Sequence, residues 1–154
     1  MEKQALKRIF DFLEEKGEHR TPFLWKLKND IPLTEDDLII KSGLDLSGTE
    51  IETLPEGLKV GGDLDLAYTF IEYLPEGLEV GGDLDLIESS VEFLPKGLKV
   101  GGYLDLSQTQ ITSLPKGLEV GGDLYIDEIP LTKYTDEELR EMIKPGFIKG
   151  KIYR

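Results

Sequence analysis

Carboxylates are the side chains of this sequence that recur in a pattern able to do chemistry. Seven aspartates stand at fixed places in a repeated stretch of the chain, namely Asp45, Asp63, Asp65, Asp83, Asp85, Asp105 and Asp123. Paired carboxylates could hydrolyse a glycosidic bond, hold a cation such as Ca²⁺, or attract a basic protein surface. A catalytic pair is a local exception to its surroundings, whereas these aspartates recur from unit to unit. We therefore interpret them as a property of the surface.

The sequence contains few residues that could carry out nucleophilic or redox chemistry. The chain has no cysteine and one histidine, His19, which stands in a charged segment beside Gly17. A Ser-His-Asp site would need His19 to meet a serine and a carboxylate by chance. The recurring Val-Gly-Gly lacks the spacing of a phosphate-binding loop. We predict no catalytic residue, no cofactor and no metal site. Ca²⁺ stays a minor alternative, because a flat strand face offers few of the oxygens that it requires.

The negative charge of the chain is concentrated in the repeated stretch. The formal net charge is −13, and residues 43–131 hold 18 of the 31 acidic and 4 of the 18 basic side chains. Such a field repels nucleic acid and anionic membranes and favours a basic protein surface. We therefore expect no direct nucleic-acid binding and no membrane binding. Without cysteine, signal-like segment or membrane-spanning stretch, the sequence predicts a soluble, cytoplasmic protein, which we expect to be monomeric.

The aspartates are positioned by a repeat with a period of 20 residues. Four uninterrupted units, 43–62, 63–82, 83–102 and 103–122, share the pattern x-L-D-L-x-x-[TS]-x-[IV]-x-x-L-P-x-G-L-x-V-G-G. A short fixed period is typical of a solenoid, in which each unit buries its apolar face against its neighbours. The period continues more weakly on both sides, so we predict a solenoid of about five coils over residues 31–131.

Each unit contains the pattern of a short strand. Residues 63–66 (Asp-Leu-Asp-Leu) alternate polar and apolar side chains, which predicts a strand with the leucines inward and the aspartates outward. Residues 74–75 (Leu-Pro) begin an extended return, Gly77 permits a tight bend, and residues 81–82 (Gly-Gly) form a left-handed or close-packed corner. The predicted fold class is a mainly β solenoid with one short parallel strand per 20-residue coil, extended return segments and small helical caps at both ends.

The N-terminal segment, residues 1–30, is predicted to be a helical cap. Apolar side chains recur at the spacing of one helix face, at Leu6, Ile9, Phe10 and Leu13. Gly17 stops this pattern, and an apolar cluster that includes Phe23 and Trp25 follows. We interpret both parts as cover for the first coil, which would otherwise expose its core. The alternative is that Phe23 and Trp25 anchor a partner, since aromatic residues are enriched at binding hot spots.

Residues 132–154 are predicted to close the far end with a short helix and a final strand. Residues 135–138 (Thr-Asp-Glu-Glu) have the pattern of a capping box, and residues 145–146 (Pro-Gly) end the helix. Residues 147–154 carry lysines, which deter aggregation when they stand on an edge strand. This segment is therefore interpreted as a C-terminal cap.

On these residues the sequence resembles the short, bacterial type of leucine-rich repeat. The strand segment of that family is L-x-x-L-x-L-x-x-N-x-L, and its last four defined positions are matched by Leu64, Leu66, Thr69 and Ile71. Gly61 stands where the family has its first leucine, and a hydroxyl side chain replaces the asparagine whose ladder satisfies backbone groups at the turn. A hydroxyl could form a shorter version of that ladder. The substitution leaves open a horseshoe or a flatter β-solenoid.

The resemblance implies recognition of a protein partner. The pattern is also similar to repeats of uncharacterised bacterial and phage proteins, which carry no assigned activity. Together with the charge, this predicts a non-catalytic interaction module that binds a basic partner surface through the seven aspartates, with Asp65, Asp85 and Asp105 at the centre. Two other functions stay open: a DNA mimic that inhibits a host nucleic-acid-binding protein, and a purely structural spacer. The aspartates could also serve solubility alone.

Overall fold

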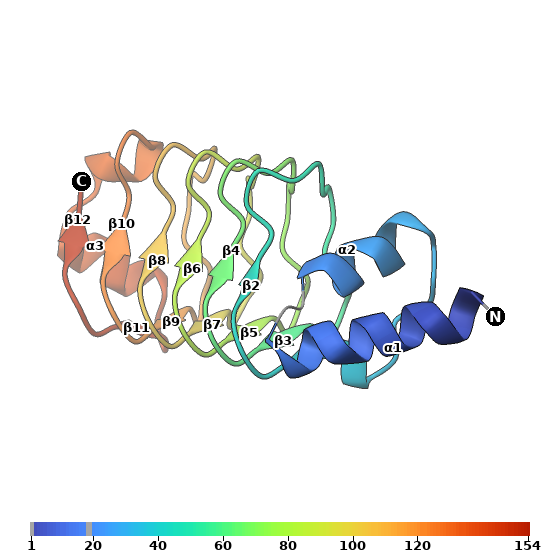
Figure 1. The fold of residues 1–154 in the computed structure, drawn as a ribbon. Coiled ribbons are helices and arrows are strands. Elements are labelled where there is room, and N and C mark those ends of the chain that lie inside the picture. The colour runs from blue at the N-terminus through green and yellow to red at the C-terminus, as the bar shows by residue number, and fades with distance from the viewer. Residues whose placement is uncertain (1, 18–19) are drawn as a thin grey trace.

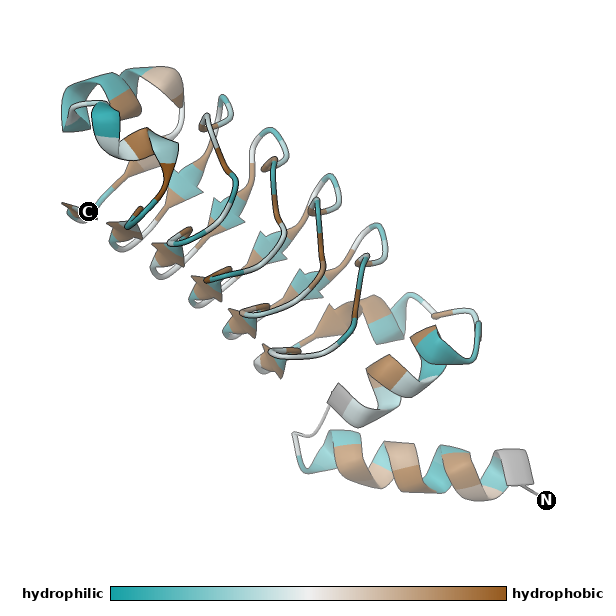
Figure 2. Cartoon of the chain, turned by 90° about the horizontal axis from the view of Figure 1, so that it is seen from above, coloured by the Kyte–Doolittle hydropathy of each residue, from teal (hydrophilic) through white to brown (hydrophobic). Residues whose placement is uncertain are grey.

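The chain folds into a parallel β-solenoid between small helical caps (Figure 1). The computed structural model describes residues 2–17 and 20–154. The coils lie side by side, with the N-terminal helices at one end and the C-terminal helix at the other, and hydrophobic segments recur at the same place in successive coils (Figure 2). This architecture confirms the predicted fold class.

The strands form two parallel six-stranded sheets. The first, which we call the aspartate sheet, consists of β2 (Leu44–Asp45), β4 (Leu64–Asp65), β6 (Leu84–Asp85), β8 (Leu104–Asp105), β10 (Leu124–Tyr125) and β12 (Ile152–Tyr153). The second, the return sheet, consists of β1 (Ile39–Ile40), β3 (Lys59–Val60), β5 (Glu79–Val80), β7 (Lys99–Val100), β9 (Glu119–Val120) and β11 (Phe147–Ile148). The aspartate sheet is the predicted stack of strands. The return segment, which was expected to be extended, thus also pairs with its neighbours over two residues.

Leucines of successive coils stack in the core. The strand register pairs Leu64 with Leu84 and Leu84 with Leu104, and all three side chains are fully buried. This confirms the expected core column. Full burial of one leucine contributes about 1.5–3 kcal/mol, and a slip of one residue would turn the whole column to solvent. The register of the solenoid is therefore strongly specified.

Glycine fulfils two different requirements in each coil. A Cβ atom on Gly81 would lie 2.2 Å from the backbone oxygen of Gly61, and one on Gly101 would lie 2.0 Å from that of Gly81. These glycines are required because the coils approach each other closely at this corner. Gly77 has open space around it but a φ of +74°, which glycine adopts without steric cost.

The N-terminal cap consists of α1 (Glu2–Glu15), α2 (Arg20–Lys28) and the 3₁₀ turn η1 (Asp36–Leu38). Phe23 is buried in the apolar core, and Leu24 and Leu27 pack against that core. Side chains of Lys26 and Asp37 form an ion pair that joins α2 to η1. The second helix is therefore the element that covers the first coil.

The first helix extends beyond the solenoid (Figure 1). It forms over the predicted amphipathic segment, and Gly17 follows it with a φ of +80°. Its Phe10 ring lies 5.3 Å from the Trp25 ring, measured between centroids. Ile9, on the predicted apolar face, is 52% exposed, and the main packing contact of α1 is with α2.

The C-terminal cap consists of the 3₁₀ helix η2 (Pro130–Lys133), α3 (Asp136–Met142) and the last strand of each sheet. The predicted capping box is present: Thr135 N donates to Glu138 Oε2 at 2.8 Å, and Glu138 N donates to Thr135 Oγ1 at 3.2 Å. The guanidinium of Arg140 donates to the carbonyl oxygens of Ile148 and Gly150. The final segment forms two strands, β11 and β12, where one was expected, because Gly150 lets the chain turn from one sheet to the other in close contact with the preceding coil.

Candidate functional site

The outer side of the aspartate sheet carries two parallel rows of side chains. The first row lies on the strands and consists of Asp45, Asp65, Asp85, Asp105, Tyr125 and Tyr153. The second row precedes the strands and contains Asp63, Asp83, Tyr103, Asp123 and Lys151. Neighbouring strands lie about 4.8 Å apart. The fold thus brings all seven predicted aspartates onto one surface, which we call the acidic face.

Each strand aspartate fixes the turn that follows it. The Oδ1 atom of Asp65 accepts a hydrogen bond of 2.9 Å from Ala67 N, and Asp85 Oδ1 accepts one of 2.9 Å from Ile87 N. Asp105 Oδ1 makes the same contact with the amide two residues ahead at 2.8 Å. An aspartate that binds the backbone two residues ahead forms an Asx turn. The orientation of these carboxylates is therefore set by the backbone.

The second row forms a ladder between coils. Asp63 Oδ1 accepts a hydrogen bond of 2.8 Å from Asp83 N, and Asp83 Oδ1 accepts one of 2.8 Å from Tyr103 N. Asp123 Oδ1 accepts one of 2.7 Å from Lys151 N. These aspartates therefore satisfy backbone donors of the next coil. They have a structural role in addition to their charge.

The threonine hydroxyls at the [TS] position of the repeat bond within their own coil. Thr69 Oγ1 donates to Leu66 O at 2.7 Å, and Thr109 Oγ1 donates to Leu106 O at 2.6 Å. Ser89 occupies the same position in the third unit, and its buried Oγ has no hydrogen-bond partner among the described residues. These threonines thus form no ladder between coils, whereas the second-row aspartates form one at the corner before the strands.

The acidic face perturbs its own titration. Burial raises the pKa of Asp85, the backbone amide of Ile87 lowers it, and the charges of Asp105 and Asp65 raise it again, so the pKa lies above its ordinary value. Burial and the surrounding aspartates, Asp85 first, likewise raise the pKa of Tyr103. Burial is the larger cause of both shifts, and the neighbouring carboxylates add to it with the same sign.

Three tyrosines extend the acidic face at its C-terminal end, a feature that the sequence analysis missed. The Tyr125 and Tyr153 rings are stacked with centroids 5.0 Å apart, and Tyr103 meets Tyr125 edge-on at 5.7 Å. The signal was present in the alignment of units, because Tyr103 stands at the position of Asp63 and Asp83. Aromatic faces beside carboxylates suit cationic side chains.

The other predicted binding residues lie in the N-terminal cap. Phe23 is 4% exposed and belongs to the core. Trp25 is half-buried against Phe10. His19 lies outside the described residues. Within residues 2–17 and 20–154, no group of three or more acidic or histidine side chains is placed to hold a metal ion, and no helix of this part has the length and apolar character needed to cross a membrane.

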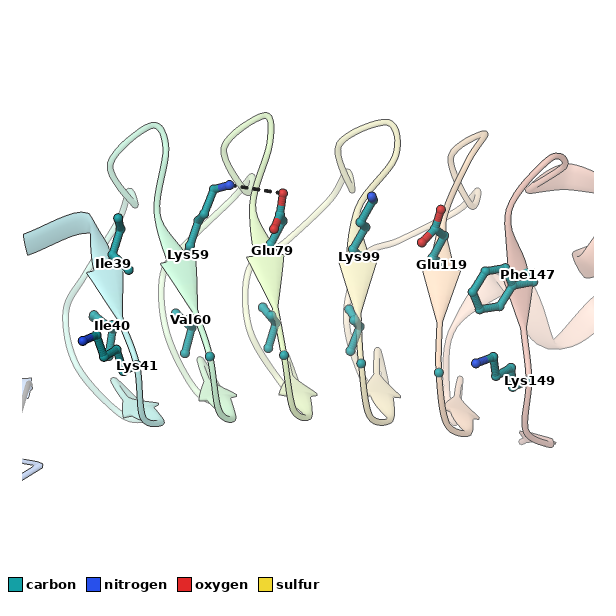
Figure 3. Close-up of a pocket in the computed structure, with 16 residues that line it drawn as sticks. Ile39, Ile40, Lys41, Lys59, Val60, Glu79, Lys99, Glu119, Phe147 and Lys149 are labelled. Atoms are coloured by element: carbon teal, nitrogen blue, oxygen red, sulfur yellow. Dashed lines mark hydrogen bonds and ion pairs between the residues drawn. The ribbon is translucent and has the colours of Figure 1, made fainter. Parts of the chain in front are cut away.

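The return sheet carries a different charge pattern (Figure 3). Its outward row alternates in sign, in the order Lys59, Glu79, Lys99 and Glu119. Lys59 Nζ lies 3.4 Å from Glu79 Oε1. A shallow groove of about 610 Å³ runs along this sheet. Because opposite charges alternate along it, this surface has no field of one sign.

Comparison with known proteins identifies no relative. No protein-family model matches the chain, and neither a curated protein nor a solved structure matches it. The similarity to leucine-rich repeats therefore stays a prediction from the repeat pattern.

Proposed function

We propose that this protein is a non-catalytic interaction module whose acidic face binds a basic surface of a protein partner. The observation that carries this proposal is the unbroken row of four like charges, Asp45, Asp65, Asp85 and Asp105, on adjacent parallel strands. A row of like charges at strand spacing opposes folding. A complementary cationic surface would remove that repulsion on binding and speed association.

The contrast between the two sheets supports this function over solubility alone. On the return sheet the corresponding row alternates lysine and glutamate and neutralises itself. The same scaffold therefore accommodates a mixed row, and a mixed row also keeps a surface soluble. The uniform sign of the row Asp45, Asp65, Asp85 and Asp105 thus requires an explanation beyond solubility.

The carboxylates of the acidic face are also preorganised. Each strand aspartate is held by a backbone amide two residues ahead, so little side-chain entropy remains to be lost when a partner binds. A rigid row of this kind suits a partner with lysines or arginines at matching intervals. The resemblance to leucine-rich repeats, which implies recognition of a protein partner, also supports the proposed binding function.

The test compares wild-type protein with the triple variant D65N/D85N/D105N in affinity capture at low and high salt. A matched control, E79Q/E119Q/E137Q, changes the net charge equally but lies on the return sheet and α3. We expect the partner to be captured by wild type and control at low salt and to be lost with the triple variant. Equal capture by all three proteins would refute the proposal.

The identity of the captured partner also distinguishes a DNA mimic from a general protein-binding module. If the partner is a nucleic-acid-binding protein and duplex DNA competes for the same site, the acidic face acts as a mimic. The strand spacing of about 4.8 Å differs from the phosphate spacing of about 3.4 Å per strand, so such mimicry would be approximate. A partner that binds unchanged in the presence of DNA leaves the general interaction function.

A further inference from the structure

The third face of the solenoid, between the end of one aspartate strand and the next return strand, carries exposed aromatic rings. Phe70, Tyr73 and Phe93 are 60%, 57% and 62% exposed. Tyr73 and Phe93 stand opposite each other in an isolated parallel bridge, so their rings come from adjacent coils. We call these three residues the ring patch. Large exposed rings that gather in one place mark interaction surfaces more often than single exposed apolar residues do.

The repeat itself shows that the scaffold does not require these rings. The equivalent positions in other units are polar, and they are Glu50, Thr53, Ser90, Gln110 and Ser113. All units share the same buried columns, so the fold at these positions is compatible with small or polar side chains. The ring patch is therefore a local departure from the repeat, in contrast to the acidic face, which the repeat generates.

Two shallow hollows adjoin the rings, and both are flanked by carboxylates. The first, of about 340 Å³, lies against Phe70 and Tyr73 and includes Glu52 and Glu72 in its lining. The second, of about 300 Å³, lies between Tyr73 and Phe93 and is lined in addition by residues that include Glu56, Glu76, Pro75 and Pro95. The lining of both hollows lies within the described residues and contains no basic side chain.

We propose that the ring patch is a second docking surface, which takes an arginine-bearing segment of a partner protein. A guanidinium group stacks on an aromatic ring and at the same time offers paired donors to a neighbouring carboxylate. Lysine is less suited to this combination, because its ammonium group is a compact, strongly hydrated point charge without a planar face to stack on a ring. The patch thus selects arginine by the combination of rings and glutamates.

Charge complementarity argues against the other occupants of an exposed aromatic surface. A second copy of this chain carries the same net charge of −13 and would bring further carboxylates toward Glu52, Glu72 and Glu76. An anionic membrane is repelled for the same reason. A basic segment is attracted by the glutamates and desolvates the rings. This inference goes beyond the proposed function, because the ring patch and the acidic face lie on different faces of each coil.

The test uses two unstructured, fluorescently labelled peptides of equal length, one with three arginines and one with three lysines in a glycine-serine background. The variant F70Q/Y73T/F93S replaces each ring by the residue found at the equivalent position of another unit, namely Gln110, Thr53 and Ser113. We expect the arginine peptide to bind wild type more tightly than the lysine peptide. In the variant, the arginine peptide should bind about tenfold more weakly and its preference over lysine should vanish.

The variant D65N/D85N/D105N is the control for the acidic face. It should weaken both peptides alike through the loss of charge, and it should keep the preference for arginine. If the ring variant binds both peptides as wild type does, the inference is overturned while the proposed function can still hold. Conversely, loss of the preference in the ring variant alone supports the inference even where the acidic face proves unnecessary for the partner.

Two further measurements complete the test, and the first of them uses wild type alone. Backbone amide shifts of wild type, followed by NMR during titration with the arginine peptide, should be largest around residues 70–76 and 90–96. Shifts confined to the aspartate strands would overturn the inference. Sedimentation of wild type at rising concentration tests for a second copy as the occupant. Self-association that disappears in F70Q/Y73T/F93S would also overturn it.

Discussion

Replacing Asp85 by asparagine should stabilise the folded protein. Asp85 stands in register between Asp65 and Asp105, at about one strand spacing of 4.8 Å from each. Two unit charges at that distance repel by about 0.9 kcal/mol in water and by about 3.5 kcal/mol at an effective dielectric constant of 20. The carboxylates are partly solvated and screened by salt, so we expect a gain of about 0.5–1.5 kcal/mol in the free energy of unfolding.

A comparison of D85N with D85A distinguishes the relief of repulsion from the loss of the hydrogen bond that Asp85 accepts. Asparagine can still accept from Ile87 N, whereas alanine cannot, and a neutral hydrogen bond of this kind contributes about 0.5–1.5 kcal/mol. D85A should therefore be less stable than D85N by about 1 kcal/mol. Asp45 provides a second control, because it stands at the end of the row with Asp65 as its aspartate neighbour. D45N should gain about half as much as D85N.

The pH dependence follows from the raised pKa of Asp85. A carboxyl group whose pKa is raised by folding binds its proton more tightly in the folded state. Its contribution to the free energy of unfolding therefore falls as the pH rises from the ordinary pKa of about 3.9 through the raised folded-state value. The advantage of D85N should be complete at pH 7 and absent at about pH 3.

The assay is urea unfolding of wild type, D85N, D85A and D45N, at neutral and acidic pH and at two salt concentrations. The advantage of D85N should shrink as salt rises, because salt screens exposed charges. If D85N is as unstable as D85A, repulsion within the row is negligible and the hydrogen bond to the charged carboxylate dominates. An advantage that is independent of both pH and salt would likewise refute the electrostatic explanation.

Three further predictions concern the scaffold and are all measured by thermal or urea unfolding. G101A should prevent proper stacking and cost several kcal/mol, because its Cβ would lie 2.0 Å from a backbone oxygen, whereas G77A should cost about 1 kcal/mol through its positive φ. S89T should add about 1 kcal/mol, because the β-branch of threonine restricts its rotamers and the threonines at this position in neighbouring coils donate to the carbonyl three residues back. F23A should cost about 3–5 kcal/mol, since Phe23 is buried where α2 covers the first coil.

Each of these predictions has a clear contrary result. Equal costs for G101A and G77A would show that the coils do not need their close approach at the glycine corner. A destabilising S89T would show that the third unit lacks room for the extra methyl group. Unchanged unfolding of F23A would show that α2 does not contribute to the stability of the folded unit. Phe23 and Trp25 would then be available as partner anchors.

The repeat made most of the fold predictable, because the buried positions of the solenoid occur several times at a spacing of 20 residues. Leucine columns, parallel register and the glycine bend all follow from that period. The last coil was harder to predict as two strands, because η2 and α3 separate it from the preceding coil. Its pattern is nevertheless present: Ile148, Gly150 and Ile152 repeat the sequence Val120, Gly122 and Leu124.

The candidate sites were only partly predictable, since their properties depend on contacts between coils. The sequence placed the aspartates outward, but it could not reveal that Asp63 and Asp83 bind amides of the next coil while Asp65 and Asp85 bind their own turn. The ring patch required knowledge of the third face, which has no regular strand and therefore no period from which exposure follows. Departures from the repeat consensus were its one signal in the sequence.

The hydrogen bonds of the acidic face explain why a short side chain with an acceptor oxygen stands at these positions, but they do not explain why that side chain is charged. Asparagine could accept from Ala67 N and Ile87 N in place of Asp65 and Asp85, and it is a favoured residue of Asx turns. A sequence shaped by the turn alone would therefore be free to use asparagine. It would avoid both the burial of a charge and the repulsion from Asp105 and Asp65, which together raise the pKa of Asp85. The chain instead keeps a carboxylate in every coil of this row up to Tyr125. The negative charge itself is thus the property that a partner with a basic surface would explain.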